Sequence, residues 1–315
     1  MLRYLILRIG SVVPVLLGMV LAVFLLLNVL PVDPIQVMIT QSGSGQAPSA
    51  AATEETIANI REELGLDRPL YLQFASYLGN ALTGDLGQSF RSNQPVAHMI
   101  AEQYPYTLRL AFSGLLVTLV LGLTFGVLAG LNPGSLIDRV LVLVATLGIA
   151  APTFWLGLML IFVFAIVWPV LPVMGVGNVK SMILPAITLG LPGAAMVARL
   201  TRANLVGVMR EDYIVTARSK GLRGWSLIAG HAMPNVVAPV LTILGLQFGN
   251  LMTGTVIVET VFSRPGIGRL GVDAILQSDY PVVQGFTLVL ATTYVLTNLA
   301  VDLIHMWIDP RIRHT

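Results

Sequence analysis

The sequence contains no cysteine and little charge, and each shortage excludes a class of protein. Without cysteine the chain has no disulfide, no thiolate metal site and no cysteine nucleophile. Only 11% of its 315 residues are charged, whereas soluble domains carry about 25%, and the mean hydropathy is +0.81. The formal net charge of +2 is too small to indicate a nucleic-acid-binding surface. The composition therefore predicts a chain that contacts membrane lipid and binds no nucleic acid.

Lysine is also scarce, which excludes nucleotide binding through a phosphate loop. Lys180 follows Val179 and Lys220 follows Ser219, so neither completes the Gly-x4-Gly-Lys-Ser/Thr motif. The four histidines have no paired metal-binding spacing, and no Gly-x-Ser-x-Gly motif marks a serine nucleophile. We therefore expect no catalytic residue, no metal and no cofactor in this chain.

Long apolar segments are abundant. A helix needs about 20 apolar residues to cross a hydrocarbon core of roughly 30 Å. Five segments meet this requirement, and a sixth that contains Pro185 and Pro192 is still apolar enough to cross. The predicted spans are residues 9–30, 107–131, 139–168, 182–203, 235–258 and 283–306. The fold class that we predict is an all-α polytopic membrane protein with about six transmembrane helices.

Two of these spans need a decision between alternatives. The apolar run at residues 9–30 is longer than the roughly 7 to 15 residues of a signal-peptide core, and no small-residue cleavage site follows it, so we expect a retained first span. Residues 139–168 are too few for two spans, and we expect Pro152 to kink one long helix there.

The distribution of basic residues predicts the orientation. With six spans, eleven basic residues share one side of the membrane, and the short loops on the other side have three, namely Lys180, Arg264 and Arg269. The positive-inside rule places the basic side and both termini in the cytoplasm. The eleven are Arg3, Arg8, Arg139, Arg199, Arg202, Arg210, Arg218, Lys220, Arg223, Arg311 and Arg313.

Three regions follow from this topology. Residues 1–30 form the N-terminal tail and first span, residues 31–104 an extracytoplasmic segment, and residues 105–315 the core domain. The extracytoplasmic segment has eight acidic residues and three arginines, and a helix is expected to begin near Thr53. Its acidity is consistent with simple solubility or with a docking surface for an extracytoplasmic partner.

A basic cytoplasmic loop at about residues 204–234 has an unusual pattern. Residues 211–220 suit a short helix with acidic residues first and basic residues last, as the helix dipole favours. Gly221 is a natural helix stop, and a second amphipathic piece, 222–231, precedes Pro234. Two short helices joined at a glycine suit a contact surface for a soluble partner, but a helix lying on the membrane surface has the same pattern.

The same loop resembles the coupling loop of ABC importer permeases, whose signature is Glu-Ala-Ala, three residues, Gly, nine residues, then Ile-x-Leu-Pro. Here Val215-Thr216-Ala217 stands at the first triplet, Gly221 at the glycine, and residues 231–234 (HAMP) at the closing element. The departures match the dipeptide/oligopeptide/nickel branch of the family. The residues that carry the resemblance are Asp212, Tyr213, Thr216, Ala217, Arg218, Lys220, Gly221, Leu222, His231 and Pro234.

Further stretches resemble the B-type permeases of that branch along nearly the whole chain. They are residues 32–34 (VDP), 64–70 (LGLDRPL), 84–89 (GDLGQS), 259–269 (ETVFSRPGIGR), 279–284 (DYPVVQ) and 309–313 (DPRIR). Each is weak alone, but their order along the chain is specific. The resemblance implies a type I ABC importer permease fold in the cytoplasmic (inner) membrane of a prokaryote.

The resemblance also implies partners and a mechanism. In this family the coupling loop sits in a cleft of a cytoplasmic ATPase, and the closure of two ATPases switches a pair of permeases between inward- and outward-facing states. The expected partners are a second homologous permease, two ABC ATPases that bind the ATP and Mg, and an extracytoplasmic solute-binding protein. Di- or oligopeptides are the expected cargo, with nickel chelates or glutathione as the alternative. A stand-alone secondary transporter and an intramembrane enzyme are the competing classes.

A few residues inside the spans are candidates for packing or for the translocation pathway. Glycines recur at four-residue spacing in the second and fifth spans, and we interpret them as close-packing faces rather than pore lining. Glu259 and Asp302 are the acidic residues expected within or near lipid depth, where charges are often functional. Glu259 is equally consistent with an ordinary boundary position, and Asp302 with a hydrogen-bonded cluster that includes Asn298 and His305.

Overall fold

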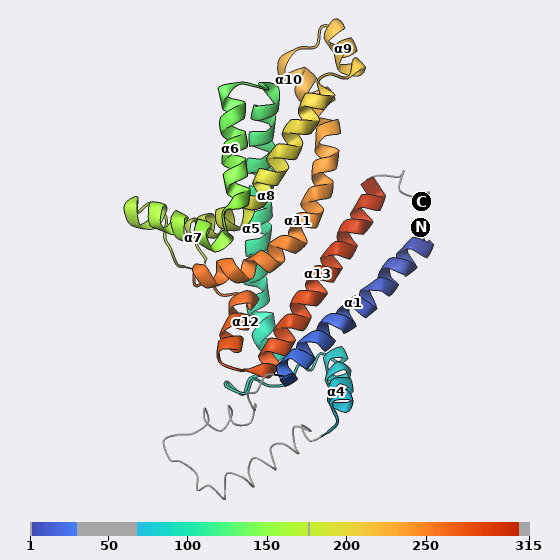
Figure 1. The fold of residues 1–315 in the computed structure, drawn as a ribbon, viewed down its shortest axis with the longest axis vertical. Coiled ribbons are helices and arrows are strands. Elements are labelled where there is room, and N and C mark those ends of the chain that lie inside the picture. Colours follow the sequence, from blue (N-terminus) through green and yellow to red (C-terminus); the bar gives the residue numbers. More distant parts are fainter. Residues whose placement is uncertain (1, 30–67, 176, 309–315) are drawn as a thin grey trace, which may run out of the picture. The chain divides into compact units, whose positions relative to one another are not determined.

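The computed structural model describes residues 2–29, 68–175 and 177–308 (Figure 1). These ranges are helical and contain no strand, and an isolated antiparallel bridge joins Gln88 and Pro95. The helix predicted to begin near Thr53 and the basic tail at Arg311 and Arg313 lie outside the described residues. The long helices are α1 (Leu2–Val29), α5 (Val96–Leu131), α8 (Val179–Val208), α11 (Met233–Val261) and α13 (Tyr280–Ile308).

The shorter helices lie between these long ones. They are α4 (Leu70–Leu82), α6 (Leu136–Ala150), α7 (Thr153–Ile161), the π-helix η1 (Phe162–Val167), α9 (Asp212–Ser219), α10 (Gly224–Leu227), the π-helix η2 (Ile228–Ala232) and α12 (Ile267–Leu276). Two compact units result. Met1–Pro105 with Gly266–Val295 forms the first unit, and Tyr106–Pro265 with Leu296–Thr315 forms the second.

The predicted membrane spans correspond to long apolar helices. Val96–Leu131, Val179–Val208, Gly224–Val261 and Tyr280–Val301 are each long and apolar enough to cross a membrane, and α6 with α7 counts as a fifth span if the bent pair is one crossing. Within α1, the apolar stretch Val12–Leu25 is shorter than these. The chain is therefore an all-α polytopic membrane protein, as the sequence predicts.

Pro152 breaks the predicted span at 139–168 instead of merely kinking it. Helix α6 ends at Ala150, α7 begins at Thr153, and the two are bent by 112°. Ala151 is extended (φ −76°, ψ 130°) because a residue that precedes proline is disfavoured in helical conformation. Proline also lacks the N–H that would continue the helix. The prediction of a kinked continuous helix was therefore wrong in degree.

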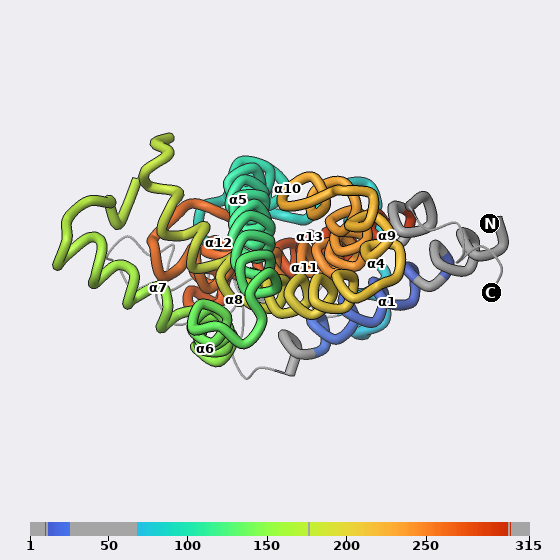
Figure 2. Tube along the Cα trace, turned by 90° about the horizontal axis from the view of Figure 1, so that it is seen from above, coloured from blue at the N-terminus to red at the C-terminus, as the bar shows by residue number. Residues whose placement is uncertain are grey.

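Glycines allow α5 to pack closely on α8 in the second unit. A Cβ atom added at Gly126 would lie 2.4 Å from Thr201 Cβ and 2.7 Å from the Ala198 carbonyl oxygen. Gly122 and Gly130 make equivalent approaches to Val197 and Leu205. Viewed from above, α5, α6 and α8 lie alongside one another (Figure 2). The interpretation of these glycines as packing faces is confirmed.

This close contact predicts that a substitution at Gly126 destabilises the protein more than a substitution at a glycine with open space around it. Gly126→Ala is expected to destabilise the protein by about 1–3 kcal/mol, because the methyl group overlaps backbone and side-chain atoms that cannot all move. Gly207→Ala in α8 is the matched control, since a Cβ there meets nothing within 4 Å. The midpoint of thermal aggregation in detergent measures the difference, and equal midpoints for the two variants would contradict the packing model.

The first unit is held by contacts between the loop before α5 and the turn before α13. The Asp279 carboxylate, which is buried, accepts hydrogen bonds from the Ser89 hydroxyl (2.5 Å) and the Phe90 amide (3.1 Å). Farther along, the Tyr104 and Thr293 hydroxyls are 2.9 Å apart. Phe24 of α1 packs on Phe74 of α4 with ring centroids 5.3 Å apart.

Candidate functional site: the helix–glycine–helix elbow

The loop between α8 and α11 forms an elbow at Gly221. Helix α9 ends in a Schellman motif, in which the Leu222 amide donates to the Ala217 carbonyl (3.2 Å) and the Gly221 amide to the Arg218 carbonyl (2.9 Å). Gly221 has φ +88°, a left-handed conformation in which an L side chain is strained. The predicted glycine stop is therefore confirmed in its geometry.

The second helical piece begins slightly later than predicted. Arg223 is extended (φ −142°, ψ 163°) and α10 starts at Gly224, not at residue 222. The four residues of α10 continue directly into the π-helical turn η2 and then into α11. The elbow is thus continuous with a membrane-crossing helix.

An apolar cluster fixes the inner side of the elbow. Ile214 and Ala217 of α9 are buried against Leu205 at the end of α8, together with Leu227 and Val236 on the α11 side. Leu222 packs against the same cluster, as the hydrophobic contact of a Schellman motif requires. A force applied to α9 is therefore transmitted to α8 and α11 through packed side chains.

The outer side of the elbow is polar and exposed. The Asn235 amide donates to the Tyr213 hydroxyl (2.8 Å), and the Thr216 hydroxyl donates to the Asp212 carbonyl (3.0 Å). The exposed residues among those predicted for the site are Asp212, Tyr213, Thr216, Arg218, Lys220, Gly221, His231 and Pro234. An exposed surface on a buried apolar base is suited to receiving a soluble protein.

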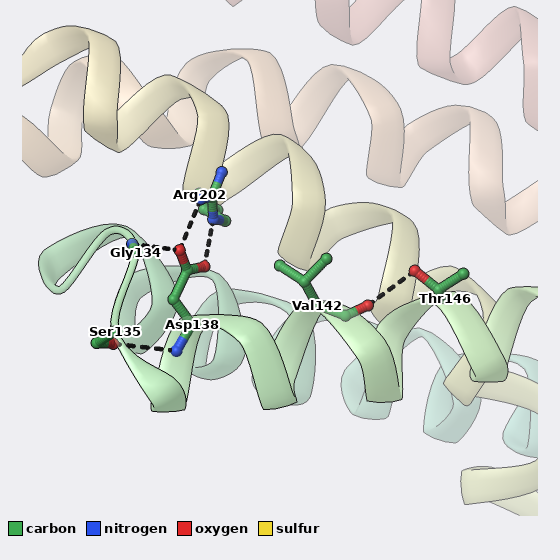
Figure 3. Close-up of polar contacts among 6 residues, drawn as sticks. All are labelled: Gly134, Ser135, Asp138, Val142, Thr146 and Arg202. Carbon is green, nitrogen blue, oxygen red and sulfur yellow. Dashed lines mark hydrogen bonds and ion pairs between the residues drawn. The ribbon is translucent and has the colours of Figure 1, made fainter.

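A buried ion pair that we did not predict joins α6 to α8 (Figure 3). Arg202 donates from Nε and Nη2 to the two Asp138 carboxylate oxygens, at 2.5 and 2.7 Å. The Gly134 amide also donates to Asp138 (2.8 Å), and the Asp138 amide donates to the Ser135 hydroxyl (3.2 Å). The sequence signal was a lone acidic residue at the start of an apolar segment on the basic side. In the sequence, Arg202 stands out only as one of the basic residues on the positive side.

This ion pair predicts a non-additive loss of stability. Asp138→Ala leaves the guanidinium of Arg202 without its partner, and a loss of about 1–3 kcal/mol is expected because Arg202 is one-third exposed. The double variant Asp138→Ala/Arg202→Ala should lose less than the sum of the single variants. Thermal unfolding of the four proteins in detergent measures the coupling, and additive effects would contradict a direct ion pair.

The candidate residues inside the predicted spans differ in their burial. Glu259 is fully buried and accepts a hydrogen bond from the Thr107 hydroxyl (2.7 Å). This burial argues against an ordinary boundary position exposed to solvent, and it places Glu259 in packing contacts. Asn298 is half-buried, and the side chain of Asp302 lies outside the described residues.

Arg264, which sequence reasoning noted only as a basic loop residue, lies in the same buried polar region as Glu259. Its side chain is 5% exposed and donates from Nη1 to the Ser181 (3.0 Å) and Gly175 (3.2 Å) carbonyls. Burial lowers the pKa of the Arg264 guanidinium, and the negative charge of Glu259 opposes that shift. The sequence signal for this buried polar region was that an acidic and a basic residue, Glu259 and Arg264, both occur in the stretch 259–269.

The all-helical fold and the exposed elbow define a membrane-spanning permease of the ABC importer class. The chain belongs to the family described as binding-protein-dependent transport system inner membrane component, whose model matches residues 122–314. The N-terminal model of the same transport systems matches residues 1–111. Together the two models cover nearly the whole chain.

Curated relatives match over the full length. The dipeptide transport system permease protein DppB of Escherichia coli is 36% identical over 100% of this chain and 99% of its own. The glutathione transport system permease protein GsiC of Escherichia coli is 40% identical over all of both chains. A probable peptide ABC transporter permease protein of Sinorhizobium fredii is 38% identical over 99% of each chain.

A solved structure supports the fold. The crystal structure of an amino acid ABC transporter with histidines matches with a TM-score of 0.51 over 66% of this chain and 92% of that chain, at 17% identity. The type I ABC importer permease fold that the sequence resemblance implied is therefore confirmed.

Proposed function

We propose that this chain is the membrane-spanning subunit of an importer that moves di- or oligopeptides across the cytoplasmic membrane, driven by ATP hydrolysis in separate subunits. The observation that carries the proposal is the exposed elbow at Gly221, built on an apolar cluster that connects it to α8 and α11. ATP and Mg bind to the partner ATPases, and this chain converts their closure into helix movement.

The assembly that we propose gives this chain four partner chains. A second, homologous permease completes the membrane part, two ABC ATPases contact the cytoplasmic elbows, and an extracytoplasmic solute-binding protein delivers the cargo. Both termini lie in the cytoplasm, as the eleven basic residues on that side favour.

The cargo assignment rests on the kinds of solute that the relatives handle. Dipeptides and glutathione both contain peptide bonds, so one scaffold suits either solute. Neither relative is similar enough to this chain to decide between them. A peptide is the common chemistry, and nickel chelates remain the alternative that the resemblance left open.

Transport by the complete system in proteoliposomes tests the proposal. Vesicles that contain both permeases, both ATPases and the binding protein are expected to accumulate a radiolabelled dipeptide only in the presence of Mg-ATP. Excess unlabelled glutathione and a nickel chelate measure the selectivity. Uptake by this chain alone without ATP would instead support a secondary transporter, and competition by the nickel chelate alone would overturn the peptide assignment.

A further inference from the structure

Helix α11 presents a polar face that the described residues leave exposed. Its exposed residues recur every three or four positions and include the polar Asn235, Thr242, Asn250, Thr253 and Thr260, with the apolar Leu246 and Ile257 between them. The exposed face of α6 is less polar, because Val140, Leu143, Val144 and Leu147 dominate it and Thr146 is the polar residue exposed among them. Lipid suits the face of α6, whereas the α11 face is suited to water or to polar groups.

Two amide side chains lie at the centre of this polar face. Gln247 is the middle residue of α11, which runs from Met233 to Val261, and Asn250 follows one helical turn later. The Asn250 amide donates to the Gln247 carbonyl oxygen (3.4 Å), and the Gln247 amide donates to the Met196 sulfur of α8 (3.4 Å). Both bonds are long, and the second has a weak acceptor.

These bonds leave hydrogen-bonding capacity unused. Each amide has two N–H donors and two carbonyl lone pairs. Among the described residues, none donates a hydrogen bond to the Asn250 side-chain carbonyl oxygen, and the side chain is exposed. Thr260 differs from Asn250 because its hydroxyl donates a hydrogen bond to the Val256 carbonyl of its own helix (2.8 Å). Asn250 therefore needs an external polar partner within the candidate span Gly224–Val261, where lipid supplies none.

We propose that Gln247 and Asn250 form a contact point for the main chain of a peptide in transit, on an aqueous pathway along the polar face of α11. This inference rests on the proposed function. A peptide bond offers the N–H and C=O groups that complement a side-chain amide. Before the buried Glu259, α11 has no charged residue. The contact therefore recognises peptide bonds without selecting the charge of the peptide side chains.

Cysteine labelling tests whether the face contacts water. The chain has no cysteine, so Asn250→Cys and Leu143→Cys each place one thiol in it, and Leu143 is 59% exposed on the apolar face of α6. In the complete transporter, a charged methanethiosulfonate is expected to modify Asn250→Cys at least about tenfold faster than Leu143→Cys. Saturating dipeptide should slow the reaction. Modification of both thiols by N-phenylmaleimide alone would show lipid contact and overturn the proposal, as would a disulfide between Asn250→Cys and a thiol of the second permease.

Uptake kinetics test whether the amide contacts the peptide. Asn250→Leu removes the polar groups at similar size and is expected to raise the KM for dipeptide uptake about two- to tenfold, the value of one hydrogen bond. Asn250→Gln, which keeps a side-chain amide, should restore a KM near that of the wild type. An unchanged KM for Asn250→Leu in a transporter that accumulates peptide overturns the contact alone. Absence of peptide uptake by the wild-type transporter overturns the proposed function as well.

Discussion

Gly221→Val is expected to reduce ATP-dependent uptake at least about tenfold while the protein still inserts into the membrane. Gly221 has φ +88°, and a left-handed conformation costs a non-glycine residue about 1–2 kcal/mol, more for a β-branched one. A Cβ atom added at Gly221 meets nothing within 4 Å in this chain, so we expect the loss to come from strain in the elbow and from its contact with the ATPase. Uptake and membrane abundance are measured on the same vesicles.

Gly221→Asn is the matched control for backbone strain. Asparagine tolerates the left-handed region better than other side chains, so this variant should keep more uptake than Gly221→Val. An equal loss of uptake in both variants would show that the size of the side chain, and not backbone strain, causes the effect. Uptake at the wild-type level in Gly221→Val would contradict a coupling role for the elbow.

Glu259→Ala is expected to cause the largest loss of stability, about 3–5 kcal/mol. Glu259 is fully buried, and its removal leaves the buried Arg264 guanidinium without the negative charge that opposes its desolvation. The Thr107 hydroxyl also loses its acceptor. Thermal stability followed by size-exclusion chromatography in detergent should show a midpoint lower by several degrees.

Two further variants separate the charge from the hydrogen bond. Glu259→Gln keeps an acceptor for Thr107 but removes the charge, whereas Thr107→Val removes only the donor. We expect Thr107→Val to lose about 1 kcal/mol and Glu259→Gln to lie between it and Glu259→Ala. Wild-type stability in Glu259→Ala would contradict a stabilising charge interaction between Glu259 and Arg264.

The sequence was informative where local chemistry determines the structure. The lengths of the apolar segments predict the long helices. A backbone that crosses lipid must satisfy its own hydrogen bonds, and a helix does so within one segment. Gly221 predicts the end of α9 because few other residues adopt its backbone conformation. The regular glycine spacing in α5 predicts a close-packed face, and α8 occupies it.

The sequence was less informative where distant segments meet. Asp138 and Arg202 are 64 residues apart, and nothing local indicates that the side chains pair. Glu259 and Thr107 are 152 residues apart, so burial could not be distinguished from a boundary position. The 112° bend at Pro152 also exceeds the expected kink, because the residues on either side of a proline decide between a kink and a break.

Cross-linking of the elbow to an ATPase tests the central claim most directly. Ser219 is exposed at the end of α9, and the chain has no cysteine, so Ser219→Cys provides one thiol beside Gly221. In the complete transporter, this thiol is expected to form a disulfide with a cysteine placed in the cleft of the ATPase, at a yield that changes when ATP is added. No cross-link in any nucleotide state, together with full peptide uptake, would contradict the account.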